Sequence, residues 1–270
     1  MPTDKPWPAA LEESVRAFYL RVLHTLNAAD APFLVGGAYA LRHYAGIERN
    51  TKDFDIFVRR EDYGSVMSVL QASGCDTDLT YPHWLGKVTC DKALVDVIFS
   101  SGNGVSLVDD DWFRHATSGH VFDVPVKLCP PEECIWSKAF VTERERYDGA
   151  DVMHLLLACA ATLDWDRLLR RFGEHWRVLF SYLCLFGFVY PSERDKIPQW
   201  VMMALLERLA EEVQQPAANE RVCQGTLISR EQYLPDLQQW GFADARLTMP
   251  HAMSEQEIAG WTEAIGAPKD

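Results

Sequence analysis

The sequence lacks an excess of basic residues. Of its 270 residues, 39 are Asp or Glu and 26 are Lys or Arg, so the formal net charge is -13. Proteins that bind nucleic acids draw much of their affinity from basic side chains that neutralise phosphates. An extensive nucleic-acid-binding surface is therefore not expected, although a local basic cleft for a nucleotide or an RNA end is compatible with this charge.

Cysteine and histidine patterns that indicate disulfide frameworks or zinc sites are also missing. The chain has seven cysteines, an odd number, with no C-x-x-C pair and no HExxH motif. Cys159 and Cys184 lie in apolar runs, which predicts buried, reduced thiols. This cysteine usage is typical of a cytoplasmic protein without structural zinc.

No apolar run is long enough to cross a bilayer. The longest, VLFSYLCLFGFVY at residues 178–190, is shorter than the roughly 20 residues that a membrane helix needs, so it predicts a buried helix. The first residues, MPTDKPWPAALEES, lack the basic and apolar regions of a signal peptide. We therefore expect a cytoplasmic protein with no membrane partner.

Two aspartates alternate with apolar residues in the stretch KDFDIFV, which ends at Val58. Side chains alternate along a strand, so Asp53 and Asp55 share one face. Two carboxylates this close repel each other, and a divalent cation such as Mg²⁺ removes that repulsion. An exposed edge strand or a pair of capping residues would explain the same pattern.

A third aspartate, Asp96, interrupts the apolar run LVDVIFS. If its strand lies beside the strand that contains Phe54, all three carboxylates face the same pocket. Three acids from two strands form the arrangement needed for two-metal phosphoryl or nucleotidyl transfer. A single acid that faces solvent would explain Asp96 equally well.

A pair of glycines separates the first predicted strand from a helix. Gly36 and Gly37 follow the strand at residues 33–35 and precede a predicted helix at 38–44. Glycine lets the backbone approach a phosphate, and a helix N-terminus supplies N–H groups and a positive dipole. The pair belongs to neither a GxGxxG nor a Walker A motif, and a tight turn also explains it.

The order of elements predicts a mixed part followed by a helical part. The predicted strands are 33–35, 54–58, 81–90, 93–100 and 121–128. The predicted helices are 8–29, 38–44, 62–72, 131–142, 148–162, 165–172, 176–186 and 197–213. We expect three domains, at 1–128, 129–215 and 216–270, with a linker at 214–219.

Together, these motifs resemble the nucleotidyltransferase superfamily, which includes DNA polymerase beta, CCA-adding enzymes and aminoglycoside nucleotidyltransferases. The matching positions are Gly36, Gly37, Asp53, Asp55 and Asp96. The resemblance covers residues 33–100 and extends more weakly over 132–157. It implies an α+β fold, in which a polymerase-beta-type mixed sheet with flanking helices precedes a helical C-terminal domain.

The sequence looks especially similar to bacterial standalone members of this superfamily. The resemblance implies transfer of a nucleoside monophosphate from a nucleoside triphosphate to an acceptor, with Mg²⁺ as cofactor. Asp53, Asp55 and Asp96 would be catalytic and would bind the metal, with Asp96 holding a second ion or acting as general base. The implied nucleotide-binding residues are Gly36, Gly37, Thr51, Lys52 and Lys138, and further candidates are Arg49, Asp148 and Asp151.

Simpler roles stay open for the weaker candidates. Lys138 would also fit a lysine that extends from a helix face to solvent, and Asp148 a helix N-cap. Thr51 would also fit the end of a loop, while Arg49 and Lys52 would balance the charge of the acids.

Two further regions have simple interpretations. A cluster of arginines, Arg167, Arg170 and Arg171, predicts a solvated helix face. In the C-terminal segment at 221–245, Ser229 predicts the N-cap of a helix. The sequence assigns no role to that segment.

The acceptor stays open among a small molecule such as an aminoglycoside, a protein side chain and a tRNA end. The acidic balance disfavours tRNA. Two other functions fit the same fold: a nucleotide-binding or interaction module without turnover, and a toxin-like member with an antitoxin partner. A structural protein whose acids face solvent is a further alternative.

Overall fold

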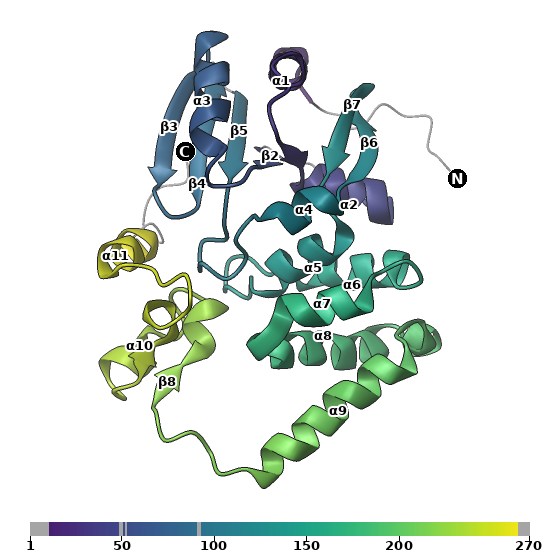
Figure 1. Ribbon diagram of the computed structural model, residues 1–270, viewed down its shortest axis with the longest axis vertical. Helices are drawn as coiled ribbons and strands as arrows, with labels where there is room; N and C mark the ends of the chain where they lie inside the picture. Colours follow the sequence, from purple (N-terminus) through teal and green to yellow (C-terminus); the bar gives the residue numbers. More distant parts are fainter. Residues whose placement is uncertain (1–10, 49–50, 52, 91–92, 264–270) are drawn as a thin grey trace. The chain divides into compact units, whose positions relative to one another are not determined.

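The computed structural model describes residues 11–48, 51, 53–90 and 93–263. Contacts divide the chain into two compact units (Figure 1). Unit 1 consists of Met1–Gly102 and Leu107–Pro130, and unit 2 of Asn103–Ser106 and Pro131–Asp270. Unit 1 contains a seven-stranded mixed sheet with helices, and unit 2 is mostly helical. This is the α+β class expected from the sequence, whereas the division into three domains stays a prediction.

The strand order in the sheet of unit 1 is β3-β4-β5-β2-β1-β7-β6. The strands are β1 (Leu34–Val35), β2 (Asp53–Phe57), β3 (Asp76–Tyr81), β4 (Leu85–Cys90), β5 (Ala93–Ile98), β6 (Thr117–Val121) and β7 (Val124–Leu128). Two pairs, β2 with β5 and β1 with β7, are parallel, and the other pairs are antiparallel. The strand with the paired aspartates is therefore central, beside the strand that contains Asp96.

One face of the sheet forms the hydrophobic core of unit 1. Alternate residues of the central strands, such as Phe54 and Ile56 of β2 and Val95 and Val97 of β5, are fully buried. They pack with α1 (Glu13–Ala28) and α3 (Tyr63–Ala72). Because side chains alternate, the residues between them point to the other face. The predicted half-buried strand is thus confirmed.

Aromatic rings hold α1 and α2 (Gly37–Ala45) against β2. The Phe54 ring stacks on Tyr19 of α1, with centroids 4.9 Å apart, and meets the edge of Tyr39 of α2 at 4.8 Å. Tyr39 also contacts Phe122, with centroids 5.6 Å apart. This cluster lies directly beneath the two aspartates that flank Phe54, so it fixes the strand that presents them.

The sequence-based prediction missed two edge strands. The expected arm at 81–90 contains β4 and the turn before it, so β3 was missed apart from its last residue, and β6 was not predicted at all. Both strands are polar, with the sequences DTDLTY and TSGHV, and β3 is largely exposed. An edge strand that faces water needs no apolar alternation, which removes the signal used to find strands.

A tight hairpin also shortens the last predicted strand. The strand expected at 121–128 begins at Val124, because Phe122 and Asp123 form the turn to β6. Both turn residues have positive φ, 52° and 66°. A two-residue turn with two positive φ values matches the right-handed twist of the hairpin strands.

The helices of unit 2 are held together in part by a buried ion cluster. The helices are α5 (Pro131–Ala139), α6 (Gly149–Cys159), α7 (Trp165–Phe172), α8 (Trp176–Val189) and α9 (Gln199–Gln214). Arg167 of α7 donates to Glu132 and to Glu133 of α5, at 3.0 Å from Glu133 Oε2. Arg171 donates to Glu133 Oε1 at 3.0 Å.

The predicted solvated arginine face is therefore wrong for Arg167, which is only 5% exposed. The prediction failed because its partners, Glu132 and Glu133, lie on a different helix and are themselves buried. Arg170 is exposed, as expected.

After α9, the chain forms a small irregular region within unit 2. A parallel pair, β8 (Val222–Cys223) and β9 (Ala243–Asp244), brackets α10 (Leu234–Gln238), and α11 (Glu255–Glu263) ends the described chain. The helix predicted to start near Ser229 begins instead at Leu234. The Ser229 hydroxyl accepts from the N–H of Gln232 at 3.1 Å, which forms a turn and not a helix N-cap.

All seven cysteines are free thiols. Cys184 is exposed, so the prediction that it is buried is wrong, whereas Cys159 is buried as expected. Within the described residues, none of the helices combines the length and apolar character that a bilayer span requires.

We predict that Phe54→Ala lowers the free energy of unfolding by about 3–5 kcal/mol, since it removes a fully buried ring and leaves a cavity. Urea unfolding of the purified protein measures this loss. Leu79→Ala is the control, because Leu79 is 42% exposed on β3 and its loss should be within about 0.5 kcal/mol. Equal losses in the two variants would contradict the central role of Phe54.

Candidate functional site

The three aspartates occupy one face of the sheet. Asp53 and Asp55 lie on β2, with Asp53 exposed and Asp55 half-buried. Asp96 lies on β5 directly opposite Asp55, because the two are paired in the parallel register of the strands. Residues paired across neighbouring strands point to the same face, about 5 Å apart at Cβ. The juxtaposition expected from the sequence is thus present, and Asp96 is half-buried.

The glycine pair lies against this face. The backbone N–H of Gly36 donates to the carbonyl of Asp55 at 3.0 Å. Gly37 has a φ of +55°, and a Cβ at this position would be 1.8 Å from Oδ2 of Asp55. A Cβ on Gly36 would be 2.3 Å from the ring of Phe57. Both positions therefore require glycine, because the backbone passes directly over β2.

The helix that follows begins at the same place. Helix α2 starts at Gly37 and its first intrahelical bond is donated by Ala40 to the carbonyl of Gly36, at 3.1 Å. The N–H groups of the first turn of a helix have no carbonyl partner within that helix and carry a partial positive charge. The carboxylate of Asp55 therefore lies next to the N-terminus of α2, and a helix N-terminus is a favourable place for an anion to bind.

The donor set suits Mg²⁺ in its chemistry, since carboxylate oxygens are the ligands that this ion prefers. Over the described part of the chain, however, no group of three or more His, Cys, Asp or Glu side chains is arranged to hold a metal ion. The three aspartates share a face without forming a closed set of ligands.

Two phenols behind the acids were not predicted as neighbours of the site. Burial, followed by the charges of Asp53, Asp55 and Asp96, raises the pKa of Tyr19 to about 12. Burial, then Tyr19 and Asp55, raise the pKa of Tyr39 as well. Both phenols therefore stay protonated at neutral pH. No sequence motif links these helix residues to the acids, because the contact depends on how α1 and α2 pack on β2.

Three further candidate residues, Arg49, Thr51 and Lys52, precede β2 in the sequence, and the structure describes only Thr51. The hydroxyl of Thr51 donates to the carbonyl of Asp53 at 2.9 Å and accepts from its N–H at 3.2 Å, so it braces the start of the strand. Arg49 and Lys52 lie outside the described residues. Their predicted roles in nucleotide binding stay predictions.

Lys138 of unit 2 does not extend to solvent, and it forms ion pairs with two aspartates. Its Nζ lies 2.8 Å from Oδ2 of Asp151 and 3.2 Å from Oδ2 of Asp148. Arg146 also donates to Asp148, at 3.0 and 3.1 Å. Asp148 occupies the N-cap position of α6, but its side chain makes no capping hydrogen bond there. It pairs with cations instead, so the capping interpretation is wrong.

Charge interactions outweigh burial in this cluster. Burial by itself raises the pKa of Asp148, but Lys138 and Arg146 more than offset it and hold that pKa below its ordinary value. Burial likewise lowers the pKa of Lys138, and Asp148 and Asp151 raise it above the usual value. Lys138 is thus a charged lysine at neutral pH.

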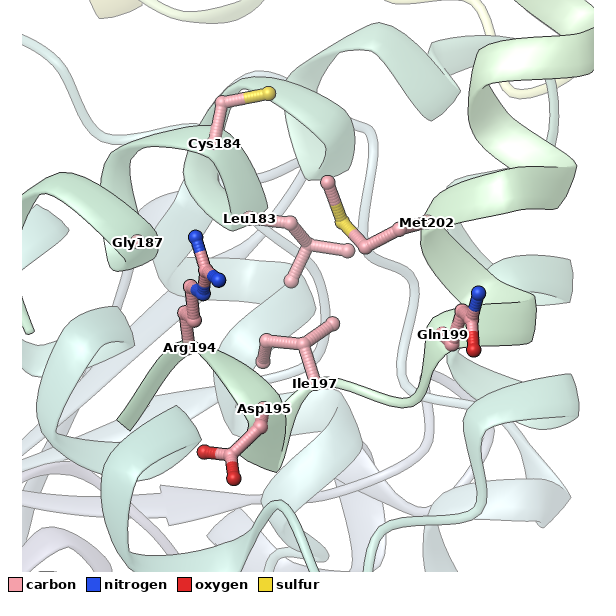
Figure 2. Close-up of a pocket in the computed structure, with 8 residues that line it drawn as sticks. All are labelled: Leu183, Cys184, Gly187, Arg194, Asp195, Ile197, Gln199 and Met202. Carbon is pink, nitrogen blue, oxygen red and sulfur yellow. The ribbon is translucent and has the colours of Figure 1, made fainter. Parts of the chain in front are cut away.

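One cavity of unit 2 contains none of the predicted residues. It has a volume of about 470 Å³ and lies between α8, the 3₁₀ turn Pro191–Lys196 and α9. Figure 2 shows Leu183, Ile197 and Met202 converging on it. Arg194 and Asp195 also line this cavity (Figure 2). The glycine pair and the three aspartates belong to unit 1, so the candidate site lies on the sheet of that unit.

No protein-family model matches this sequence, and no curated protein sequence does either. Solved structures match at low identity. The antibiotic-resistance factor ANT(2'')-Ia is similar over 63% of this chain and 96% of its own, at 16% identity and a TM-score of 0.45. The lincosamide antibiotic adenylyltransferase LnuA, solved with lincomycin bound, is similar over 54% and 96%, at 15% identity and a TM-score of 0.38.

A third match is the polyadenylate synthase of Megavirus, over 55% of this chain and 33% of its own, at 11% identity and a TM-score of 0.37. The α+β class predicted from the sequence is confirmed by the mixed sheet and the helices of the structure. At identities of 16% or less and TM-scores below 0.5, these similarities assign no activity and no acceptor to this chain.

We predict that Gly37→Ala destabilises the protein by about 1–3 kcal/mol more than Gly46→Ala, since only the first substitution forces a Cβ into Asp55. Both glycines have positive φ, 55° and 67°, so both variants share the backbone strain of a left-handed residue. A Cβ on Gly46 meets no atom within 4 Å. Equal midpoints and slopes for the two variants in urea unfolding would contradict the close approach of Gly37 to Asp55.

We predict that Lys138→Met lowers the free energy of unfolding at pH 7 by about 3 kcal/mol, because Asp151 loses the ammonium that pairs with it and, among the described residues, Asp148 keeps only Arg146. The stabilisation from Asp148, whose pKa is depressed in the folded state, is present above its unfolded pKa of about 4 and disappears as the pH falls through the folded value. The gap between variant and wild type should therefore shrink below about pH 4.

Lys196→Met is the matched control in the same unit. Lys196 pairs with Glu193 at 3.4 Å, and both side chains are about 40% exposed, so its loss should change stability by less than about 1 kcal/mol. A constant gap between Lys138→Met and wild type across the pH range would show that the carboxylate pairing is not responsible.

Proposed function

We propose that this chain is a cytoplasmic, Mg²⁺-dependent nucleotidyltransferase that moves a nucleoside monophosphate from a nucleoside triphosphate to the hydroxyl group of an acceptor. One observation carries the proposal. Asp96 lies in register with Asp55 on the neighbouring parallel strand, and Gly37 brings the N-terminus of α2 against that same carboxylate. Acids and an anion-binding helix end thus meet at one point of the sheet.

Each group of this site has a defined task in that reaction. The N–H groups at the start of α2 bind phosphate oxygens, which glycine at position 37 allows to approach. Asp53 and Asp55, with Asp96, would hold Mg²⁺, which neutralises phosphate charge when bound. Thr51 keeps the backbone of Asp53 in place through its two hydrogen bonds.

The chemical step needs a base beside the acceptor. The acceptor oxygen bonds to the α-phosphorus, the bond to pyrophosphate breaks, and the acceptor proton passes to a carboxylate. Asp96 fits this role because it lies on β5, one strand farther from β1 and the glycine turn than β2, which carries Asp53 and Asp55. Holding a second ion is the alternative role of Asp96 within the same proposal.

For residues away from the three aspartates and the glycine turn, the proposed roles rest on the resemblance to nucleotidyltransferases. Lys52 and Arg49 would add positive charge near the acids. Lys138 is a further nucleotide-binding candidate, and Asp148 and Asp151 hold its ammonium. The ion pairs at 2.8 and 3.2 Å support a charged Lys138.

A second candidate function is a nucleotide-binding module without turnover. The absence of a closed set of metal ligands over the described residues favours it. Titration calorimetry with Mg²⁺ and each nucleoside triphosphate, followed by mass spectrometry of the mixture, separates the two. Binding without product in any acceptor extract would support the module.

We predict that Asp53→Asn, Asp55→Asn and Asp96→Asn each lower Mg²⁺-dependent transfer at least about a hundredfold, because each removes a metal ligand or the base. Transfer is measured with labelled nucleoside triphosphates and a cell extract. Asp76→Asn on the exposed edge strand β3 is the control and should retain the wild-type rate. Any variant of the trio with the wild-type rate would remove that residue from the proposed machinery.

A further inference from the structure

A charged row crosses the sheet through the candidate site. In the register of the strands, Asp55 of β2 is opposite Asp96 of β5, Asp96 is opposite Lys87 of β4, and Lys87 is opposite Asp78 of β3. Residues paired in this way share a face. Lys87 is therefore the direct neighbour of Asp96 on the side away from Asp55.

Lys87 differs from an ordinary surface lysine. It is half-buried, and its ammonium forms no ion pair with a carboxylate of the described residues. By comparison, Lys127 of β7 in the same sheet is exposed and donates to the hydroxyl of Ser118 at 2.8 Å. A half-buried cation beside an acid, without a partner carboxylate within 4 Å, is available to bind an anion.

The strand order places Lys87 on the side of Asp96 that is away from the glycine turn. The glycine turn lies at β1, next to β2, and Lys87 lies on β4, beyond β5. Strands in a sheet are about 4.8 Å apart, so Lys87 is some 10 Å from β2 and about 14 Å from β1. Phosphates held at the start of α2 are thus beside Asp55, at one end of the row, whereas Lys87 lies two strands from Asp55, between the proposed base Asp96 and Asp78.

We propose that Lys87 determines acceptor specificity, by binding a carboxylate or phosphate group of a small hydroxylated acceptor while the acceptor hydroxyl lies at Asp96. This inference rests on the proposed nucleotidyltransfer. The hydroxyl oxygen bonds to the α-phosphorus, pyrophosphate leaves, and the proton passes to Asp96, while Lys87 changes no bond. Thr89, half-buried on the same face of β4 two residues along, adds a hydroxyl to this end of the site.

The net charge of the chain argues against a long RNA as the acceptor. A long RNA would gain one cation here but would meet a chain with a net charge of -13. A small anion needs only the single favourable contact.

The test uses the small-molecule fraction of a cell extract, separated by ion exchange into anionic, neutral and cationic pools. Each pool is incubated with the protein, Mg²⁺ and nucleoside triphosphates labelled at the α-phosphate, and labelled products are counted. We expect product from the anionic pool. Lys87→Met should reduce it about tenfold or more, the effect of losing one charge-assisted hydrogen bond. Lys87→Arg should retain most of it, and Lys127→Met should be unchanged.

Within the anionic pool, phosphatase treatment before the assay distinguishes phosphate from carboxylate acceptors. Product from the neutral or cationic pool, from added RNA or from protein overturns the proposal, as does an anionic product that Lys87→Met leaves unchanged. Binding of Mg²⁺–nucleotide without product from any pool also overturns it. Failure to bind Mg²⁺–nucleotide at all, measured by calorimetry, instead removes the proposed nucleotidyltransfer itself.

Discussion

The structure depends on the parallel pairing of β2 with β5, which puts like charges side by side on one face and a dry core on the other. Asp55 and Asp96 are in register, while Phe54 and Val95, their neighbours along the strands, are fully buried. Burial of the apolar face stabilises the arrangement that holds two carboxylates together against their repulsion. The fold thus maintains a charge arrangement that would not form by itself.

Buried charge is handled differently in the two units. In unit 2, acids are neutralised by basic side chains of the same unit, as Glu133 is by Arg167 and Asp151 by Lys138. In unit 1, the acids of β2 and β5 have the turn of α2 on one side and Lys87 on the other. Charges that are matched internally stabilise a structure, whereas charges gathered on one open face attract a ligand.

Local pattern was a good guide where one face of an element is buried and the other is not. The alternation around Phe54 predicted the strand and the face of its aspartates, and the glycine pair predicted the turn before α2. Pattern failed for the edge strand β3, whose polar side chains face water, and for Arg167, whose carboxylate partners are about 35 residues away in sequence. For both β3 and Arg167, the structure depends on contacts with residues that are distant in sequence.

The sequence by itself determined the three aspartates, the glycine pair and their order, because these follow from side-chain type and the two-residue period of a strand. Only the tertiary structure decided what lies beside them. The strand order makes Lys87 the neighbour of Asp96, and the packing of α1 puts Tyr19 behind the acids. Strand register and helix packing depend on burying apolar surface across the whole unit, and a local stretch of sequence does not contain that information.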